Sequence, residues 1–251
     1  MSSIEISAIA FTFSFGGALL GMFIGPRLPK HHIDAETKEV VRLGMGLVGT
    51  IAGIALGLLI SSAYSYYNKQ TDELVQMSAD VSSLGRLLQQ YGPEANGVRE
   101  SLRVAIQRIL AENWPNDRLE KRFSATAAPA ADVYNQLRAL APQDDEHRVM
   151  KSEATSLLKS VALMRSLVIE QSSTTVLRPL LYVMIFWLTA IFFSWGLFSS
   201  PNATAVTTFF VAALCVSGAI LMILELYTPY SGWLRLSSAP LRLAYDSLGR
   251  Q

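Results

Sequence analysis

The sequence predicts an all-α membrane protein with four transmembrane helices and a helical, coiled-coil-like insert between the second and third spans. Long stretches of the chain carry no charged residue, which is typical of membrane spans. Charged residues are concentrated in one central segment, as in a soluble domain. Within that segment apolar residues recur at helical spacing and no strand pattern occurs. Together these observations exclude an ordinary soluble protein.

The charge distribution separates a polar segment from an apolar remainder. Of the 251 residues, 16% are charged and 51% are hydrophobic, whereas about 25% are charged in a typical soluble chain. Residues 66–176 hold 27 of the 41 charged residues, which is the density of a soluble domain. The other 140 residues hold 14, too few for a surface in contact with water. The overall charge content therefore averages two different parts.

Four spans follow from the uncharged stretches. A spanning helix needs about 20 mostly apolar residues, and residues 6–26 and 43–68 carry no charge. Residues 179–224 are uncharged over a length that holds two spans, with a turn at 199–202. We therefore predict spans at about 5–26, 43–66, 179–198 and 203–226. No basic residue precedes the first span, which indicates a retained helix and not a signal peptide.

The insert, residues 67–176, is predicted to be a small helical bundle whose first and last helices continue spans two and three. Its first seam is spaced 3-4-3-4-3, as in a coiled coil, and comprises Leu74, Met77, Val81, Leu84, Leu88 and Tyr91. Gly92-Pro93 ends this helix, and a second seam follows at Val98, Leu102, Ala105 and Ile109. A short helix is expected near 131–141. A last helix, capped by Asp144 or Asp145, carries the third seam: Met150, Ala154, Leu157, Val161, Met164 and Val168.

The tail, residues 228–251, alternates leucines with arginines. This pattern predicts an amphipathic segment that lies along the membrane surface. Tyr227, Tyr230 and Trp233 are expected to anchor it at the interface between lipid and water.

Glycines recur at intervals of four in both of the first two spans. The first glycine ladder is Gly17, Gly21 and Gly25, and the second is Gly49, Gly53 and Gly57. Without side chains, helix backbones can approach closely, and helix association in lipid depends on such packing. Spans one and two could clasp each other within one subunit. Alternatively, one ladder could mediate contacts between subunits around a pore.

A second face of span two is a candidate for the wall of a pore. We call it the candidate pore face, and it comprises Leu47, Ile51, Ile54, Ala55, Leu58 and Ser62. An apolar constriction of this kind can gate an ion path by dewetting. The same pattern is equally expected of a surface that faces lipid or is buried. Lys38 and Arg42 would lie near one mouth of such a path.

Glu225 lies at the end of the fourth span, where a carboxylate is costly and therefore a functional candidate. The alternative is a structural role in the headgroup zone, hydrogen-bonded to the backbone or paired with Arg178 or Arg235.

The sequence contains no recognisable catalytic motif. His31-His32, near Asp34 and Glu36, could ligate a metal, but adjacent histidines point in different directions, so a solvated loop is expected. Nucleotide-binding glycine loops, nucleophile elbows and paired-cysteine metal sites are absent from the sequence. Basic residues are scattered among nearly equal numbers of acidic ones, which argues against nucleic-acid binding. We expect no cofactor, no metal and no enzymatic activity.

The basic residues give conflicting evidence on orientation. The positive-inside rule places connections rich in Lys and Arg in the cytoplasm. A cytoplasmic first connection is favoured by its basic residues, Arg27, Lys30, Lys38 and Arg42. A cytoplasmic insert and tail are favoured by Lys159, Arg165, Arg178, Arg235 and Arg242. Four spans cannot satisfy both, and the charges favour a cytoplasmic insert only slightly.

Three stretches of the chain resemble bacterial membrane proteins of the bestrophin-like family. They are residues 39–47 (EVVRLGMGL), residues 87–95 (LLQQYGPEA) with the later Trp114-Pro115, and residues 223–232 (ILELYTPYSG) followed by 237–242 (SSAPLR). With the order of two spans, insert, two spans and tail, the resemblance covers nearly the whole chain. Bestrophins are pentameric anion channels with helices around a central pore and a helical cytosolic region. The resemblance thus implies a homo-oligomer in the bacterial inner membrane, with the insert and both termini in the cytoplasm.

Two functions follow as hypotheses. The first is an oligomeric ion channel or pore-forming subunit in which span two lines the path. The second is a non-conducting membrane anchor or scaffold whose helical insert binds a protein partner.

Overall fold

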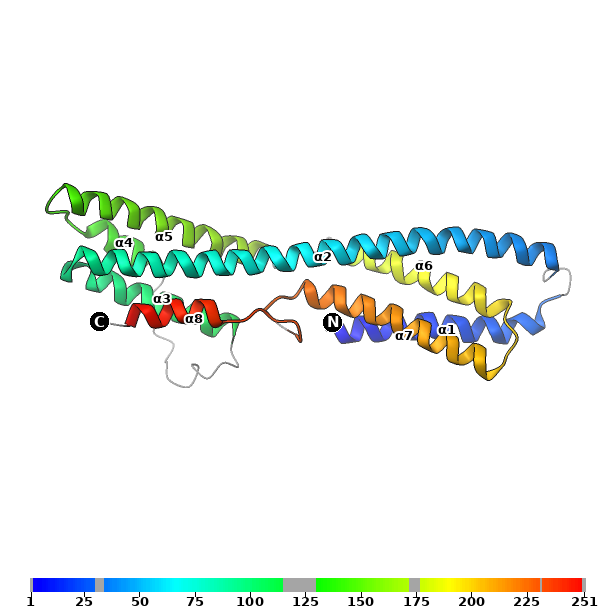
Figure 1. Ribbon diagram of the computed structural model, residues 1–251. Coiled ribbons are helices and arrows are strands. Elements are labelled where there is room, and N and C mark those ends of the chain that lie inside the picture. The colour runs from blue at the N-terminus through cyan, green and yellow to red at the C-terminus, as the bar shows by residue number, and fades with distance from the viewer. Residues whose placement is uncertain (1, 30–33, 115–129, 172–176, 231, 250–251) are drawn as a thin grey trace. The chain divides into compact units, whose positions relative to one another are not determined.

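The computed structural model describes residues 2–29, 34–114, 130–171, 177–230 and 232–249, and all its regular elements are helices (Figure 1). The long helices are α1 (Ser3–Ile24), α2 (Ala35–Tyr91), α3 (Asn96–Asn113), α5 (Asp145–Gln171), α6 (Leu177–Leu197) and α7 (Ala203–Leu226). Shorter elements are η1 (Gly25–Arg27), η3 (Pro93–Ala95), α4 (Ala130–Ala139) and α8 (Ala239–Gly249). Four helices, α1, α2, α6 and α7, are long and apolar enough to cross a membrane. The predicted all-α, four-span class is confirmed.

The chain divides into two compact units. The membrane unit comprises residues 1–67 and 174–228, and the bundle unit comprises residues 68–173 and 229–251. The tail after α7 therefore folds with the insert. One helix, α2, contributes to both units, and its 57 residues correspond to a length of about 85 Å at 1.5 Å per residue.

In the membrane unit, α1 packs tightly against α6. A Cβ at Gly21 would clash with the backbone oxygen of Phe193, and a Cβ at Gly25 would clash with that of Leu197. From the other side, a Cβ at Gly196 would clash with the backbone oxygen of Ala18. The two backbones thus approach each other reciprocally, through small residues on both helices.

The helices of the membrane unit also share three apolar core clusters. One core cluster joins α2 to α6 and α7 through Ala52, Leu59 and Ala63 of α2 and residues such as Met184 and Ile223. Two further clusters join α1 to α6 and α7 and include Ala10 with Leu188 and Ala18 with Phe192. Span two is the least covered of the four, because 11% of its most apolar window is buried, against 33–44% for the others.

The bundle unit buries the first two predicted seams and part of the third. All six residues of the first seam are at most 4% exposed, and Val98, Leu102, Ala105 and Ile109 of the second are buried on α3. In the third seam Ala154 and Val161 are buried, while the intervening buried leucine is Leu158, not Leu157. Gly92 ends α2 with φ of 109°, a conformation that favours glycine. Asp144 caps α5, since its Oδ1 accepts a hydrogen bond from the His147 backbone N–H at 2.8 Å.

The tail ends in α8, which packs on α3. Leu241, Ala244, Tyr245 and Leu248 are buried, and a Cβ at Gly85 of α2 would clash with the Leu248 side chain. The sequence predicts that this apolar face lies on the membrane surface, whereas in the structure it is occupied by the helices of the bundle unit.

Candidate functional site

The candidate pore face lies on the part of α2 that contributes to the membrane unit. Four of its residues, Leu47, Ile51, Ile54 and Leu58, are between 46% and 66% exposed in the single chain. They recur at intervals of three or four residues, so they share one side of the helix. Ala55 is only partly exposed because it packs on the core cluster shared with α6 and α7. Of the candidate pore face, these four large aliphatic side chains and Ser62 are therefore exposed.

Ser62, the last residue of the predicted face, contacts the end of α7. Its Oγ lies 3.0 Å from the hydroxyl of Tyr227. The Tyr227 ring also stacks on Tyr66, with centroids 5.2 Å apart. Tyr227, which the sequence suggests as an interfacial anchor, thus fastens α7 to α2. The sequence gives little sign of this, because the two partners are 165 residues apart.

The two glycine ladders have different surroundings. The first lies against α6, where Gly17 would place a Cβ 3.2 Å from the Thr189 oxygen. At Gly49, Gly53 and Gly57 a Cβ would meet no atom within 4 Å. The two ladders therefore do not meet within one chain. On α6, Gly196 takes part in this close packing. The sequence does not predict that role, because Gly196 is a single glycine in an apolar span and belongs to no ladder.

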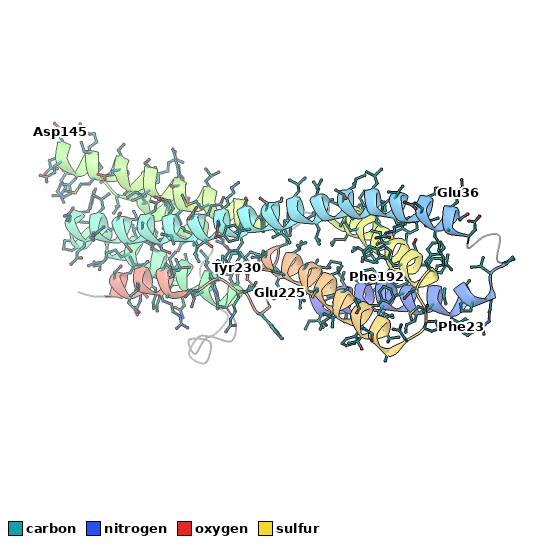
Figure 2. The ribbon with its side chains drawn as sticks, turned by 45° about the vertical axis from the view of Figure 1, so that its right-hand side comes forward. Phe23, Glu36, Asp145, Phe192, Glu225 and Tyr230 are labelled. Carbon is teal, nitrogen blue, oxygen red and sulfur yellow. The ribbon has the colours of Figure 1, made fainter. Side chains whose placement is uncertain are left out.

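Lys38 and Arg42 are exposed near the start of α2, where Glu36 is also found (Figure 2). Lys38 lines an open recess of about 460 Å³ together with Gly25, Pro26 and residues 197–201. The first connection and the turn between α6 and α7 thus lie at the same end of the membrane unit.

Glu225 is 8% exposed in the last turn of α7 (Figure 2). It therefore lies inside the protein, and its position fits the structural alternative as well as a functional one. The side chain of Arg178, one of its suggested partners, is outside the described part of the chain.

His31 and His32 lie outside the described residues. Nearby, Asp34 caps α2 by accepting a hydrogen bond from the Thr37 backbone N–H at 2.8 Å. Among the described residues there is no group of three or more side chains arranged to hold a metal ion.

These features define a class of protein, a four-span helical membrane protein in which the second span continues into a helical bundle. A family model, the bestrophin-like domain, matches residues 12–241. The chain belongs to the bestrophin-like family.

Solved structures share this fold. The chain is similar to two variants of a bacterial bestrophin homolog from Klebsiella pneumoniae. One has a TM-score of 0.66 at 14% identity, over 99% of this chain and 98% of that one. The other has a TM-score of 0.61 at 14% identity, over 95% and 97%. A further structure, described as a membrane protein, has a TM-score of 0.64 at 13% identity over 96% of both chains. No curated protein matches the sequence significantly.

Proposed function

We propose that the chain is a subunit of an oligomeric ion channel in the bacterial inner membrane, with α2 lining the path. The observation that carries this proposal is the exposure of span two. Among the four spans it is the least buried within the chain, and its uncovered side presents large aliphatic residues at Leu47, Ile51, Ile54 and Leu58. A ring of such faces, one from each subunit, would form an apolar constriction of the kind that gates ion flow.

Membership of the bestrophin-like family supports the same proposal. The second glycine ladder also supports it, because its open surroundings leave room for a helix of a neighbouring subunit. Lys38 and Arg42 would then lie at the mouth of the path, where positive charge attracts anions.

Ion flux into liposomes tests the proposal. Purified protein should raise flux above that of empty liposomes, and Ile51→Ala and Leu58→Ala should change the rate because they widen the constriction. Val211→Ala is the matched control, since Val211 is 51% exposed on α7 and lies on another span. Flux equal to that of empty liposomes under varied voltage, pH and calcium would favour the scaffold function instead.

The size of the detergent-solubilised protein provides an independent test. Four spans of one subunit do not enclose a conduit of this design, so we expect an oligomer. A monomer at all protein concentrations would contradict the channel proposal.

A further inference from the structure

A small cavity lies inside the bundle unit, between α2, α3, α5 and the segment that follows α7. Its volume is about 90 Å³, which corresponds to roughly three water molecules at about 30 Å³ each. Apolar side chains form much of its surface, namely Leu74 and Met77 of α2, Ile109 of α3 and Met164 of α5. A cavity of this size can take a small chemical group but not a drug-sized ligand.

Two aromatic rings form adjacent walls of the cavity. Trp114 and Tyr230 have ring centroids 5.5 Å apart and planes at 76°. Each ring is held by its polar end, because Trp114 Nε1 donates to the Leu236 oxygen at 2.8 Å and the Tyr230 hydroxyl donates to Gln70 Oε1 at 3.4 Å. Aromatic walls of this kind attract methylated ammonium groups through the negative potential of the ring faces. Polarisable methionine sulfurs suit the same contact.

One carboxylate on the cavity wall, Glu73, makes long contacts with the neighbouring residues that the structure describes. The Glu73 side chain is 14% exposed, with Lys69 Nζ 3.8 Å from its Oε1 and Gln70 Nε2 3.4 Å from its Oε2. The Lys69 side chain is 62% exposed, so water weakens that ion pair. A carboxylate that is mostly removed from water gains from a closer positive charge.

The arginine that also lines the cavity is already engaged. Arg165 Nη2 lies 3.7 Å from Glu112 Oε2, and Glu112 Oε1 accepts a hydrogen bond from Arg108 Nε at 2.7 Å. The Glu112 carboxylate is thus shared between two arginines. The positive charge of Arg165 is directed to Glu112, and Glu73 remains the acidic group for a cation in the cavity.

We propose that this cavity binds a small organic cation with a methylated ammonium group, enclosed by Trp114 and Tyr230 and balanced by Glu73. The assignment goes beyond ion conduction and does not depend on it, because binding can be measured directly.

Calorimetric titration of the full-length protein in detergent tests the site. Tetramethylammonium chloride should bind saturably, with sodium chloride as the reference for ionic strength. Uncharged tert-butanol, which has the same number of heavy atoms, should bind at least tenfold more weakly. Equal binding of both compounds would show an apolar cavity only and would overturn the proposal, as would no binding of tetramethylammonium.

Variants separate the charge from the aromatic walls. Glu73→Gln keeps the side-chain size and should weaken tetramethylammonium binding at least tenfold. The matched control is Glu100→Gln, because this carboxylate is 67% exposed and paired with Arg103 on α3, so its loss should leave binding unchanged. Tyr230→Phe keeps the ring and should retain binding, whereas Tyr230→Leu should lose it. Wild-type affinity in a folded Glu73→Gln variant would overturn the proposal.

Discussion

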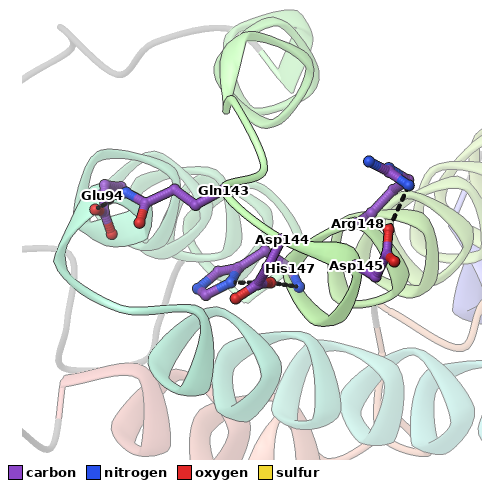
Figure 3. A network of polar contacts seen from close by, with 6 residues as sticks. All are labelled: Glu94, Gln143, Asp144, Asp145, His147 and Arg148. Carbon is purple, nitrogen blue, oxygen red and sulfur yellow. Dashed lines mark hydrogen bonds and ion pairs between the residues drawn. The ribbon is translucent and has the colours of Figure 1, made fainter.

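His147 joins two helix ends in the bundle unit through its ring. Its Nδ1 lies 2.6 Å from Asp144 Oδ1 (Figure 3), and the backbone oxygen of Tyr91, at the end of α2, hydrogen-bonds the ring as well. The Tyr91 ring also meets the imidazole edge to face. The hydrogen bond with the Asp144 side chain is the main reason why the pKa of His147 is raised, with smaller contributions from the Asp144 charge, the Tyr91 backbone and Glu146. Both ring nitrogens can donate only in the protonated form.

The bundle unit should therefore be more stable in mildly acidic solution. Because the folded pKa of His147 lies above its ordinary value of 6.5, its stabilising contribution is complete below about pH 6.5 and is lost as the pH rises through the folded pKa. The pKa of Asp144 is lowered from 3.8, mainly by the backbone hydrogen bond from His147. Its contribution is therefore present above pH 3.8 and is lost as the pH falls through the folded value.

Thermal unfolding of wild type and His147→Ala across this pH range checks the prediction. The difference in melting temperature should be largest between about pH 3.8 and pH 6.5 and should decrease at alkaline pH, where the charge-dependent part is lost. Arg148→Ala is the control, because the Arg148–Asp145 pair is 71% and 90% exposed (Figure 3) and should contribute little at any pH. A difference that does not vary with pH would contradict the role given to His147.

Among the α1 glycines, Gly21 is the one at which an added Cβ would come nearest to the α6 backbone, at the Phe193 oxygen. Gly21→Ala should destabilise the membrane unit by about 1–3 kcal/mol, because the added methyl group forces the two backbones apart. Gly16 on the same helix has no atom within 4 Å of a Cβ, so Gly16→Ala should leave stability unchanged or raise it through better helix propensity. Melting temperatures in detergent compare the two variants. Equal effects would mean that α1 and α6 do not pack as described.

At the scale of the element, hydrophobic periodicity predicts which face of a helix is buried, but it does not always predict which element covers that face. The first seam of the insert is buried as predicted because its partners are the other amphipathic helices of the same polar segment. In the membrane unit, lipid is as apolar as the helix surface, so hydropathy does not identify a partner. The first glycine ladder therefore predicts a close approach, while its partner α6 becomes visible only in the structure.

The tail illustrates the same limit for a surface helix. An amphipathic helix carries one apolar face whether it lies on lipid or on protein, so the sequence of α8 is compatible with both. The position of Gly85 is the discriminating feature, because only its lack of a side chain admits Leu248. From the sequence alone, a single glycine in the middle of a long seam is not recognisable as the place where another helix docks.

Leucines on opposite sides of α8 test its docking. Leu241 is fully buried and Leu243 is 71% exposed. Leu241→Ala should cost about 2–5 kcal/mol of bundle stability through the cavity that it leaves, and Leu243→Ala should stay within about 0.5 kcal/mol. Thermal unfolding in detergent compares the two. Equal costs would show that the tail is not docked on its buried face.

At the scale of the whole molecule, the sequence predicts the class and the spans because both depend on local composition. The wall of the cavity does not follow from composition, since Glu73, Ile109, Met164 and Tyr230 come from four separate segments. For the candidate pore face, the spacing identifies the residues that share a side of α2. It does not distinguish Ala55, which packs on α6 and α7, from the exposed leucines and isoleucines beside it.

The orientation of the chain also depends on how distant segments come together. The first connection, which carries four basic residues, and the turn between α6 and α7, which carries none, lie at one end of the membrane unit. The opposite flanks carry five basic residues, and on this balance we expect the bundle unit in the cytoplasm. In a Cys215→Ala background, Ser152→Cys on α5 should resist a membrane-impermeant maleimide in intact cells, because Ser152 is an exposed residue of the bundle unit.

A second cysteine makes this experiment a test of the fold as well as of the orientation. Ser200→Cys, in the exposed turn between α6 and α7, should react with the same reagent in intact cells. Four spans place Ser152 and Ser200 on opposite sides of the membrane in either orientation. The fold therefore requires that only one of the two introduced cysteines reacts in intact cells. Labelling of Ser152→Cys alone would show that the orientation is opposite to the expected one, with the four spans retained. Equal labelling of both cysteines in intact cells would contradict the four-span topology itself.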